Sequence, residues 1–249
     1  MTKGLIVLIN GLVLGTLVGC SEVDSEDIRT SGFNVDATAT TTDGSTNIFV
    51  RLELGDDFDS DRIVLTAGDT LVADLAGRRT ELSRVNGSYR GSFDQVNGGE
   101  VLTLELLRPD DVSALDTRVL LPNSFEINAP DPTATFNAGE TITVVWSPVD
   151  PENPMSIRYG VDCPLIENNT SFHAGRIGRT FEVADIGTHT VAINSILNVF
   201  DDQDQFVTGT PCPLEIELER ENRGVIDPAF DDGSFEAIHR QVVVVSVTP

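Results

Sequence analysis

Apolar and polar side chains alternate along most of this chain. Between Asn47 and Leu54, the apolar residues Ile48, Val50, Leu52 and Leu54 fall on every second position, with Arg51 and Glu53 on the other face. A period of two predicts a β-strand that buries one of its faces. Comparable runs recur through the first half of the chain at Phe33–Thr41, Arg62–Thr66, Thr70–Leu75, Thr80–Val85, Ser88–Phe93 and Val101–Leu107.

Short segments rich in Gly, Asn and Asp separate these predicted strands. They are Asp43-Gly44, Ala67-Gly68-Asp69, Asn86-Gly87 and Asn97-Gly98-Gly99. Because Gly, Asn and Asp tolerate the backbone angles of tight turns, each segment predicts a hairpin or a short loop. Short strands at this spacing, without a helical period, predict an antiparallel sandwich.

The second half of the chain repeats this pattern with different residues. We interpret Pro109–Pro122 as a last strand and a linker between the halves, with room for one helical turn at Asp110–Leu115. The sequence therefore predicts an all-β fold of two tandem antiparallel β-sandwich domains, residues 32–121 and 122–249, each expected to fold alone. The predicted strands of the second half are Phe125–Ile127, Glu140–Pro148, Ser156–Val161, Thr180–Val183, Thr188–Asn194, Leu214–Glu219 and Ile238–Val247.

Part of the second half resembles a fibronectin type III or related immunoglobulin-like domain. Val144-Val145-Trp146-Ser147-Pro148, a loop and Ile157-Arg158-Tyr159 are similar to the second and third strands of that fold. Ile186-Gly187-Thr188-His189-Thr190-Val191 is similar to its tyrosine-corner stretch, with His189 where the fold has a Tyr. The resemblance implies a scaffold and no particular function, because unrelated functions share such folds.

The first 20 residues have a different character. Lys3 precedes an almost unbroken apolar run, Gly4–Leu17, which is too short to span a bilayer and has the length of a signal-peptide core. The run ends in Leu17-Val18-Gly19-Cys20, which resembles the bacterial lipobox, Leu-x-[Gly/Ala]-Cys. The resemblance implies a signal peptide over residues 1–19 and a lipoprotein carrying diacylglycerol on Cys20. Stable anchoring takes more than one acyl chain, palmitate for example.

The residues after Cys20 bear on where the lipoprotein would reside. Ser21 stands where an Asp would resemble the inner-membrane retention signal of enteric bacteria, so the sequence favours the outer membrane over the inner. Residues 20–31 are polar and acidic, and we expect them to form the acylated Cys and a flexible tether. The expected location is the cell envelope.

Charge narrows the range of partners. The only lysine, Lys3, would leave with the signal peptide, so 15 Arg would face 40 acidic residues, a formal net charge of −25. Such a surface repels nucleic acid. Most of this charge is expected to be a solvated surface, and binding of a cationic partner or a divalent metal is the alternative. The expected partners are the membrane, through the lipid, and another envelope protein.

Two cysteines remain once Cys20 carries lipid. Cys163 and Cys212 each begin the tripeptide Cys-Pro-Leu. An even pair in an exported protein predicts a disulfide. A metal site or a reactive thiol is the alternative, but zinc needs further Cys or His at close spacing, and only His173 is near.

One acidic loop has part of a calcium-binding pattern. Asp57, Asp59 and Asp61 occupy positions 1, 3 and 5 of such a loop, but Arg62 then stands where the pattern has Gly, and Gly68 where it has Glu. The loop is therefore either a solvated hairpin or a calcium site. No other cofactor is expected.

The chain has no recognisable catalytic motif. None of its three histidines lies in a His-Glu-x-x-His pattern, and neither a Gly-x-Ser-x-Gly sequence nor a P-loop occurs. We expect His173 and His239 at the surface, and His189 in place of a packed aromatic ring.

Few aromatic residues are present to stack on sugars. Of the one Trp and two Tyr, Trp146 and Tyr159 fall on predicted core faces, and Tyr89 alternates with Phe93 in a strand. We therefore expect a non-catalytic envelope lipoprotein that acts as a binding or structural module. The alternatives are a carbohydrate-binding or polysaccharide-processing accessory protein and, third, an enzyme.

Overall fold

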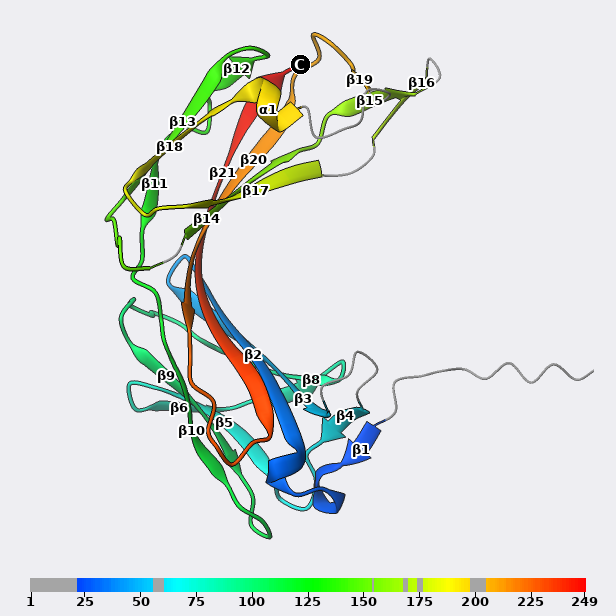
Figure 1. Cartoon of the computed structure of the whole chain (residues 1–249), viewed down its shortest axis with the longest axis vertical. Coiled ribbons are helices and arrows are strands. Elements are labelled where there is room, and N and C mark those ends of the chain that lie inside the picture. The colour runs from blue at the N-terminus through cyan, green and yellow to red at the C-terminus, as the bar shows by residue number, and fades with distance from the viewer. Residues whose placement is uncertain (1–21, 56–60, 154, 168–169, 174–176, 198–204) are drawn as a thin grey trace, which may run out of the picture.

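The computed structural model describes residues 22–55, 61–153, 155–167, 170–173, 177–197 and 205–249. Nearly all of this is β-structure; the helical elements within these ranges are α1 (Ile193–Leu197) and two 3-10 turns, η1 (Ser25–Asp27) and η2 (Thr30–Gly32). None of the described helices has the length and apolar character needed to cross a membrane. The molecule is elongated and curved, with two packed regions end to end (Figure 1). The prediction of an all-β sandwich fold is confirmed.

The first region packs two sheets around one core. Alternate residues of β2 point inward, and Phe33, Val35 and Ala37 are almost fully buried. The turn between β2 and β3 is the predicted one at Asp43-Gly44, where both residues have positive φ, +51° and +75°. One sheet contains β2 (Phe33–Thr42), β3 (Ser45–Leu54), β4 (Asp61–Val64), β8 (Ser88–Phe93) and β7 (Ser83–Val85); the other contains β10 (Ala114–Leu120), β9 (Val101–Leu107), β5 (Thr70–Leu75) and β6 (Arg78–Glu81).

The second region has an immunoglobulin-like strand order. A three-stranded sheet of β11 (Glu126–Ala129), β13 (Thr141–Ser147) and β18 (Thr188–Ala192) packs against β14 (Met155–Val161), β17 (Ile177–Val183), β20 (Cys212–Arg223) and β21 (Asp232–Thr248). This order corresponds to strands A-B-E facing G-F-C-C′. Trp146 lies on β13 and Tyr159 on β14, so the predicted second and third strands are confirmed. β12 (Thr135–Asn137) pairs with the end of β21, and β15 (Pro164–Glu167), β16 (Thr170–His173) and β19 (Gln205–Phe206) form a small separate sheet.

Strands β20 and β21 join the two regions. β21 has 17 residues, pairs with β20 from Arg223↔Glu236 to Cys212↔Val247, and also runs parallel to β2 of the first region. In Figure 1 this long strand passes from the lower region to the upper one without a break. From Phe235 to Val247 every second side chain of β21 is buried, except that of Gln241, which is half-buried. Phe235 and Ala237 lie in the first core, while Val243, Val245 and Val247 lie in the second.

The two cores therefore share one strand, β21. The sequence boundary at 121/122 assigns all later residues to the second domain, whereas the first core also holds Phe230, Phe235 and Ala237. The division into two domains that fold alone stays a prediction. The predicted strands Leu214–Glu219 and Ile238–Val247 are confirmed in place, but both extend several residues further toward the first region.

The prediction of a flexible tether is wrong for residues 22–31. The strand β1 (Glu22–Asp24) pairs in parallel with β4, and η1 and η2 then carry the chain across the end of the first core. Ser25 and Thr30 are fully or almost fully buried. Polar composition suggested a solvated segment, but its polar groups are paired with buried partners, described below.

The predicted helical turn at Asp110–Leu115 is also absent. Residues 109–111 form bends, and Ala114–Leu120 is already strand β10. Asp111 accepts hydrogen bonds from the main-chain N–H and the hydroxyl of Thr30, at 2.8 and 3.2 Å. This long-range pairing uses the carboxylate that could otherwise have favoured a helix start.

Candidate functional site

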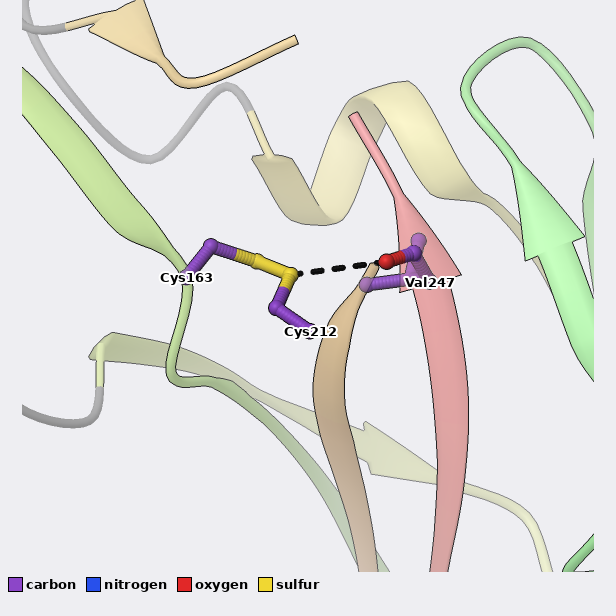
Figure 2. The surroundings of a disulfide bond; sticks show 3 residues. All are labelled: Cys163, Cys212 and Val247. Atoms are coloured by element: carbon purple, nitrogen blue, oxygen red, sulfur yellow. Dashed lines mark hydrogen bonds between the residues drawn. A yellow bond between two sulfur atoms is a disulfide. The ribbon is translucent and has the colours of Figure 1, made fainter. Parts of the chain in front are cut away.

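The predicted disulfide between Cys163 and Cys212 is present (Figure 2). Cys163 follows the end of β14 and Cys212 opens β20, so the bond joins two neighbouring strands of the second core at a Cα–Cα distance of 5.1 Å. Both side chains are buried, and Cys212 Sγ contacts the Val247 carbonyl oxygen at 3.4 Å. A disulfide sulfur carries no hydrogen, so this is a packing contact. The chain loop that this bond closes contains β15, β16 and β19.

A buried ion pair lies where the second core meets the first. Arg220 on β20 is fully buried and pairs with Asp185, which also accepts a hydrogen bond from the Trp146 indole N–H at 2.6 Å. The Arg220 guanidinium donates further bonds to the carbonyl oxygens of Asn123, at 2.6 Å, and Pro148, at 2.9 Å. One cation therefore ties the inter-region segment to two loops of the second core, and its charge is compensated where it is buried.

Phe125 and His239 complete this junction. The Phe125 ring lies 4.9 Å from the Arg220 guanidinium carbon on one side and 4.9 Å, edge to face, from the His239 ring. His239 is 3% exposed, so the prediction that it lies at the surface is wrong. Its place on β21 explains this, because position 239 shares the inward face of Phe235 and Ala237.

The His239 ring has one satisfied nitrogen and one unpaired nitrogen. Nε2 lies 3.3 Å from the Phe125 carbonyl oxygen, which can only accept, so Nε2 carries the proton of the neutral ring. Nδ1 is then a lone-pair acceptor, and it is buried without a hydrogen-bond partner. Burial lowers the pKa of His239 from its ordinary value, the nearby Arg220 charge acts in the same direction, and the Phe125 carbonyl and Asp43 oppose both.

A groove of about 510 Å³ opens beside this junction. Residues of the first region, the second region and the shared strand all contribute to its walls. They include Asp43, Val96, Phe125, Glu126, His239 and Gln241.

A larger cavity, of about 720 Å³, lies beside the segment that follows β1. Arg108 is its buried cation and is 7% exposed. The guanidinium donates to Asp69 at 2.9 Å, to the Ile28 carbonyl oxygen at 2.8 Å and to the Ser25 carbonyl oxygen at 2.5 Å. It also lies 4.9 Å from the Phe33 ring centroid. This Arg, Asp and Phe cluster is the counterpart in the first core of Arg220, Asp185 and Phe125 in the second.

The aromatic residues that could stack on a sugar are all internal. Trp146, Tyr159 and Tyr89 are 1%, 0% and 4% exposed. The Tyr89 hydroxyl accepts a bond from the Leu65 N–H at 2.7 Å, so it serves the first core. The one Trp and both Tyr of the chain are thereby removed as stacking platforms.

The other predicted site residues fall largely outside the described residues. Cys20 is one of these, and so are Asp57 and Asp59; Asp61 is the first residue of β4. Among the residues that the structure describes, no group of three or more His, Cys, Asp or Glu side chains is arranged to hold a metal ion. Lipidation of Cys20 and calcium binding at the acidic loop stay predictions.

His189 does not occupy a tyrosine corner. β18, which carries it, is strand E of the sandwich, next to β13, whereas the tyrosine corner belongs to strand F, here β20. The expectation of a packed ring is confirmed, since the ring lies 5.7 Å from that of Phe181 and 6.2 Å from that of Tyr159. His173 is in β16, and its side chain lies outside the described part.

The junction groove does not contain the hydrogen bonds of a serine triad. Ser147 lines the groove beside His239, but its hydroxyl accepts a bond from the Asn128 side-chain amide at 2.7 Å, and His239 Nε2 is held by a main-chain carbonyl. A triad requires an imidazole nitrogen on the hydroxyl.

These features define an all-β protein of immunoglobulin-like sandwich type. No protein-family model matches the chain, and no curated protein sequence matches it.

Among solved structures, the chain is similar to fibronectin(III)-like modules of Clostridium thermocellum CbhA (11% identity, 86% of this chain and 90% of that chain, TM-score 0.21). It is also similar to the Yersinia pseudotuberculosis adhesin InvE (12% identity, 86% and 60%, TM-score 0.22) and to a chimeric titin Z1Z2 tandem (8% identity, 87% and 98%, TM-score 0.22). Likenesses of this size carry no argument about function.

Proposed function

We propose that the chain is a non-catalytic lipoprotein of the bacterial cell envelope that acts as a rigid acidic spacer, presenting its second core at a fixed place relative to the membrane. The observation that carries this proposal is the continuity of β21, which is paired with β20 and runs through both cores. A strand of 17 residues spans roughly 55 Å. β20 pairs with it from Glu236 to Val247, across the junction, and this ladder opposes bending there. Arg220 and Phe125 fasten the inter-region segment to it.

The position of the N-terminal segment supports a placement of the first core close to the membrane. Glu22 is already paired with Arg62 of β4, and only Ser21 separates it from Cys20. A lipid on Cys20 would therefore hold the first core near the membrane surface, with no long flexible linker between them. The acidic residues of this end, Glu26 and Asp27 among them, would oppose flat adsorption on an anionic leaflet.

Anchoring is tested by labelling the acylated protein. The full chain and its Cys20→Ser variant are expressed in a bacterium that processes lipoproteins and is fed an alkyne-bearing palmitate analogue. The unmodified chain is expected to take up label and sediment with membranes, while Cys20→Ser does neither. A Cys163→Ser/Cys212→Ser variant is the matched control and keeps its label. Label on Cys20→Ser, or none on the unmodified chain, would contradict the proposal.

A further inference from the structure

The groove at the junction of the two cores is built from three separate parts of the chain. The first core contributes the β2–β3 turn with Asp43, the second contributes Phe125 and Glu126, and β21 contributes His239 and Gln241. The two β21 residues lie on the same face of the strand, at the point where its inward side chains pass from one core to the other. Polar residues occupy this crossing where apolar residues precede and follow them.

The walls of the groove are fixed by main-chain contacts. The Val96 N–H donates to the Gly44 carbonyl oxygen at 2.8 Å, which holds the turn that carries Asp43. On the same side, Gly98 lies so close to the backbone of Asn123 that an added Cβ would be 2.5 Å from its Cα. The groove is thereby formed before any ligand arrives, which reduces the ordering cost of binding.

The groove offers hydrogen-bond acceptors and negative charge to a ligand. His239 Nδ1 is a buried lone pair without a partner, on a ring that lines the groove. A buried acceptor without a partner is unfavourable, and a hydrogen-bond donor on a ligand would remove this cost. Two exposed carboxylates also line the groove, Asp43 from the first region and Glu126 from the second. Among the described residues that line the groove, none is Lys or Arg, and the charge of nearby Arg220 is compensated by Asp185.

We propose that this groove binds an organic cation with N–H donors, a protonated primary amine or a guanidinium group, with His239 Nδ1 accepting a hydrogen bond and Asp43 and Glu126 supplying the opposing charge. A basic side chain of a protein and a small free polyamine both carry this group. The site goes beyond the spacer function and does not depend on it.

The test uses the full chain with Cys20→Ser, ¹⁵N-labelled on histidine. Agmatine, which has one guanidinium and one primary amine, is titrated at constant ionic strength, and the ring nitrogens of the three histidines are followed by NMR. The His239 Nδ1 resonance is expected to move in the direction of an accepted hydrogen bond, while those of His189 and His173 stay in place. A blocked Gly-Arg-Gly peptide forms a second arm, and whichever of the two binds more tightly identifies the source of the cation.

Two matched comparisons separate a site from general attraction to an acidic protein. Tetramethylammonium has the charge without N–H donors and is expected to leave Nδ1 unmoved. Glu126→Gln is expected to weaken agmatine binding about two- to fivefold, the range for one exposed ion pair, whereas Glu81→Gln on β6, outside the groove, leaves the affinity unchanged.

Three results would overturn the proposal. The first is an equal response to tetramethylammonium, and the second is an equal loss of affinity in Glu81→Gln and Glu126→Gln. The third is an Nδ1 resonance that already has its hydrogen-bonded position without any cation, because a water molecule would then satisfy this atom.

Discussion

At the scale of single residues, a buried arginine and a buried histidine lie side by side where β21 passes from one core to the other. Arg220 and His239 are register partners on β20 and β21, and both contact the ring of Phe125. A buried cation beside a buried neutral imidazole makes this crossing sensitive to protonation. If His239 gains a proton, a second positive charge arises next to Arg220 in a site with little water.

The pH dependence of stability follows from the lowered pKa of His239. In the unfolded chain the ring titrates near pH 6.5, while burial holds the folded pKa below that. The stabilisation is therefore complete above about pH 6.5 and is lost as the pH falls toward the folded pKa, because the unfolded chain binds the proton more readily. The melting temperature is expected to fall between pH 7 and pH 5.5.

The variant His239→Gln isolates this contribution. Gln stays neutral over this range, so the variant should lose part of the slope of melting temperature against pH. His189, whose pKa is also lowered by burial, gives the comparison variant His189→Gln. A His239→Gln protein with the full slope of the unmodified chain would show that His239 does not titrate in this way.

At the scale of elements, sequence patterning was informative where one face of a strand is buried. The alternation in β2, β3 and β9 predicts those strands closely, and the Asp43-Gly44 and Asn86-Gly87 turns have the positive φ angles that their residues favour. The disulfide was predicted from the even pair of cysteines together with the predicted export. These features depend on short stretches of chain, so local pattern is sufficient to predict them.

The features that the sequence did not predict depend on distant partners. The first core includes side chains from the beginning of β21. The polar residue His239 interrupts the apolar alternation, so the predicted strand began at Ile238 and not at Phe235. With His239 counted as an inward residue, the alternation of buried positions continues back to Phe235 and predicts the longer strand. The docking of residues 22–32, which buries Ser25 and Thr30, had no comparable signal, because it depends on Arg108, about 80 residues away in the chain.

Arg108 is expected to hold the N-terminal segment in place. In Arg108→Met the carbonyl groups of Ser25 and Ile28 lose their donor, and β1 with the two 3-10 turns should detach. Trypsin then cleaves after the exposed Arg29 at least several-fold faster than in the unmodified chain, as followed by mass spectrometry. Arg118→Met, which changes an exposed side chain of β10, is the control. Equal cleavage of the Arg108 and Arg118 variants would mean that Arg108 does not hold the N-terminal segment in place.

The disulfide is expected to stabilise the second core selectively. Its loop spans a sequence separation of 49 residues, for which chain entropy gives about 4 kcal/mol as an upper figure. A Cys163→Ala/Cys212→Ala variant should lower the denaturant midpoint reported by Trp146, the only Trp of the chain. Amide exchange of β5 and β9 in the first core should stay unchanged. Equal loss of protection in both cores would contradict a local effect.

At the scale of the whole molecule, the proposed spacer function requires the two cores to move as one body. Domains joined by a flexible linker reorient freely, whereas these cores are connected by β21, which has side chains in both of them and pairs with β20 across the junction. The segment Leu121–Phe125, which begins at the end of the predicted linker Pro109–Pro122, is partly buried and held by Arg220. A spacer function requires this rigidity, since a hinge at the junction would let the second core move relative to the membrane.

The distance between the two cores, measured by pulsed electron spin resonance, tests this claim most directly. Nitroxide labels are placed on exposed strand positions by Glu81→Cys in the first core and Thr188→Cys in the second, in the full chain with Cys20→Ser. Labels at Glu81→Cys and Arg51→Cys, both in the first core, give the width that the label itself contributes. One distance peak between the cores, as narrow as that within the first core, is the predicted result; a distribution much broader than this reference would contradict the account.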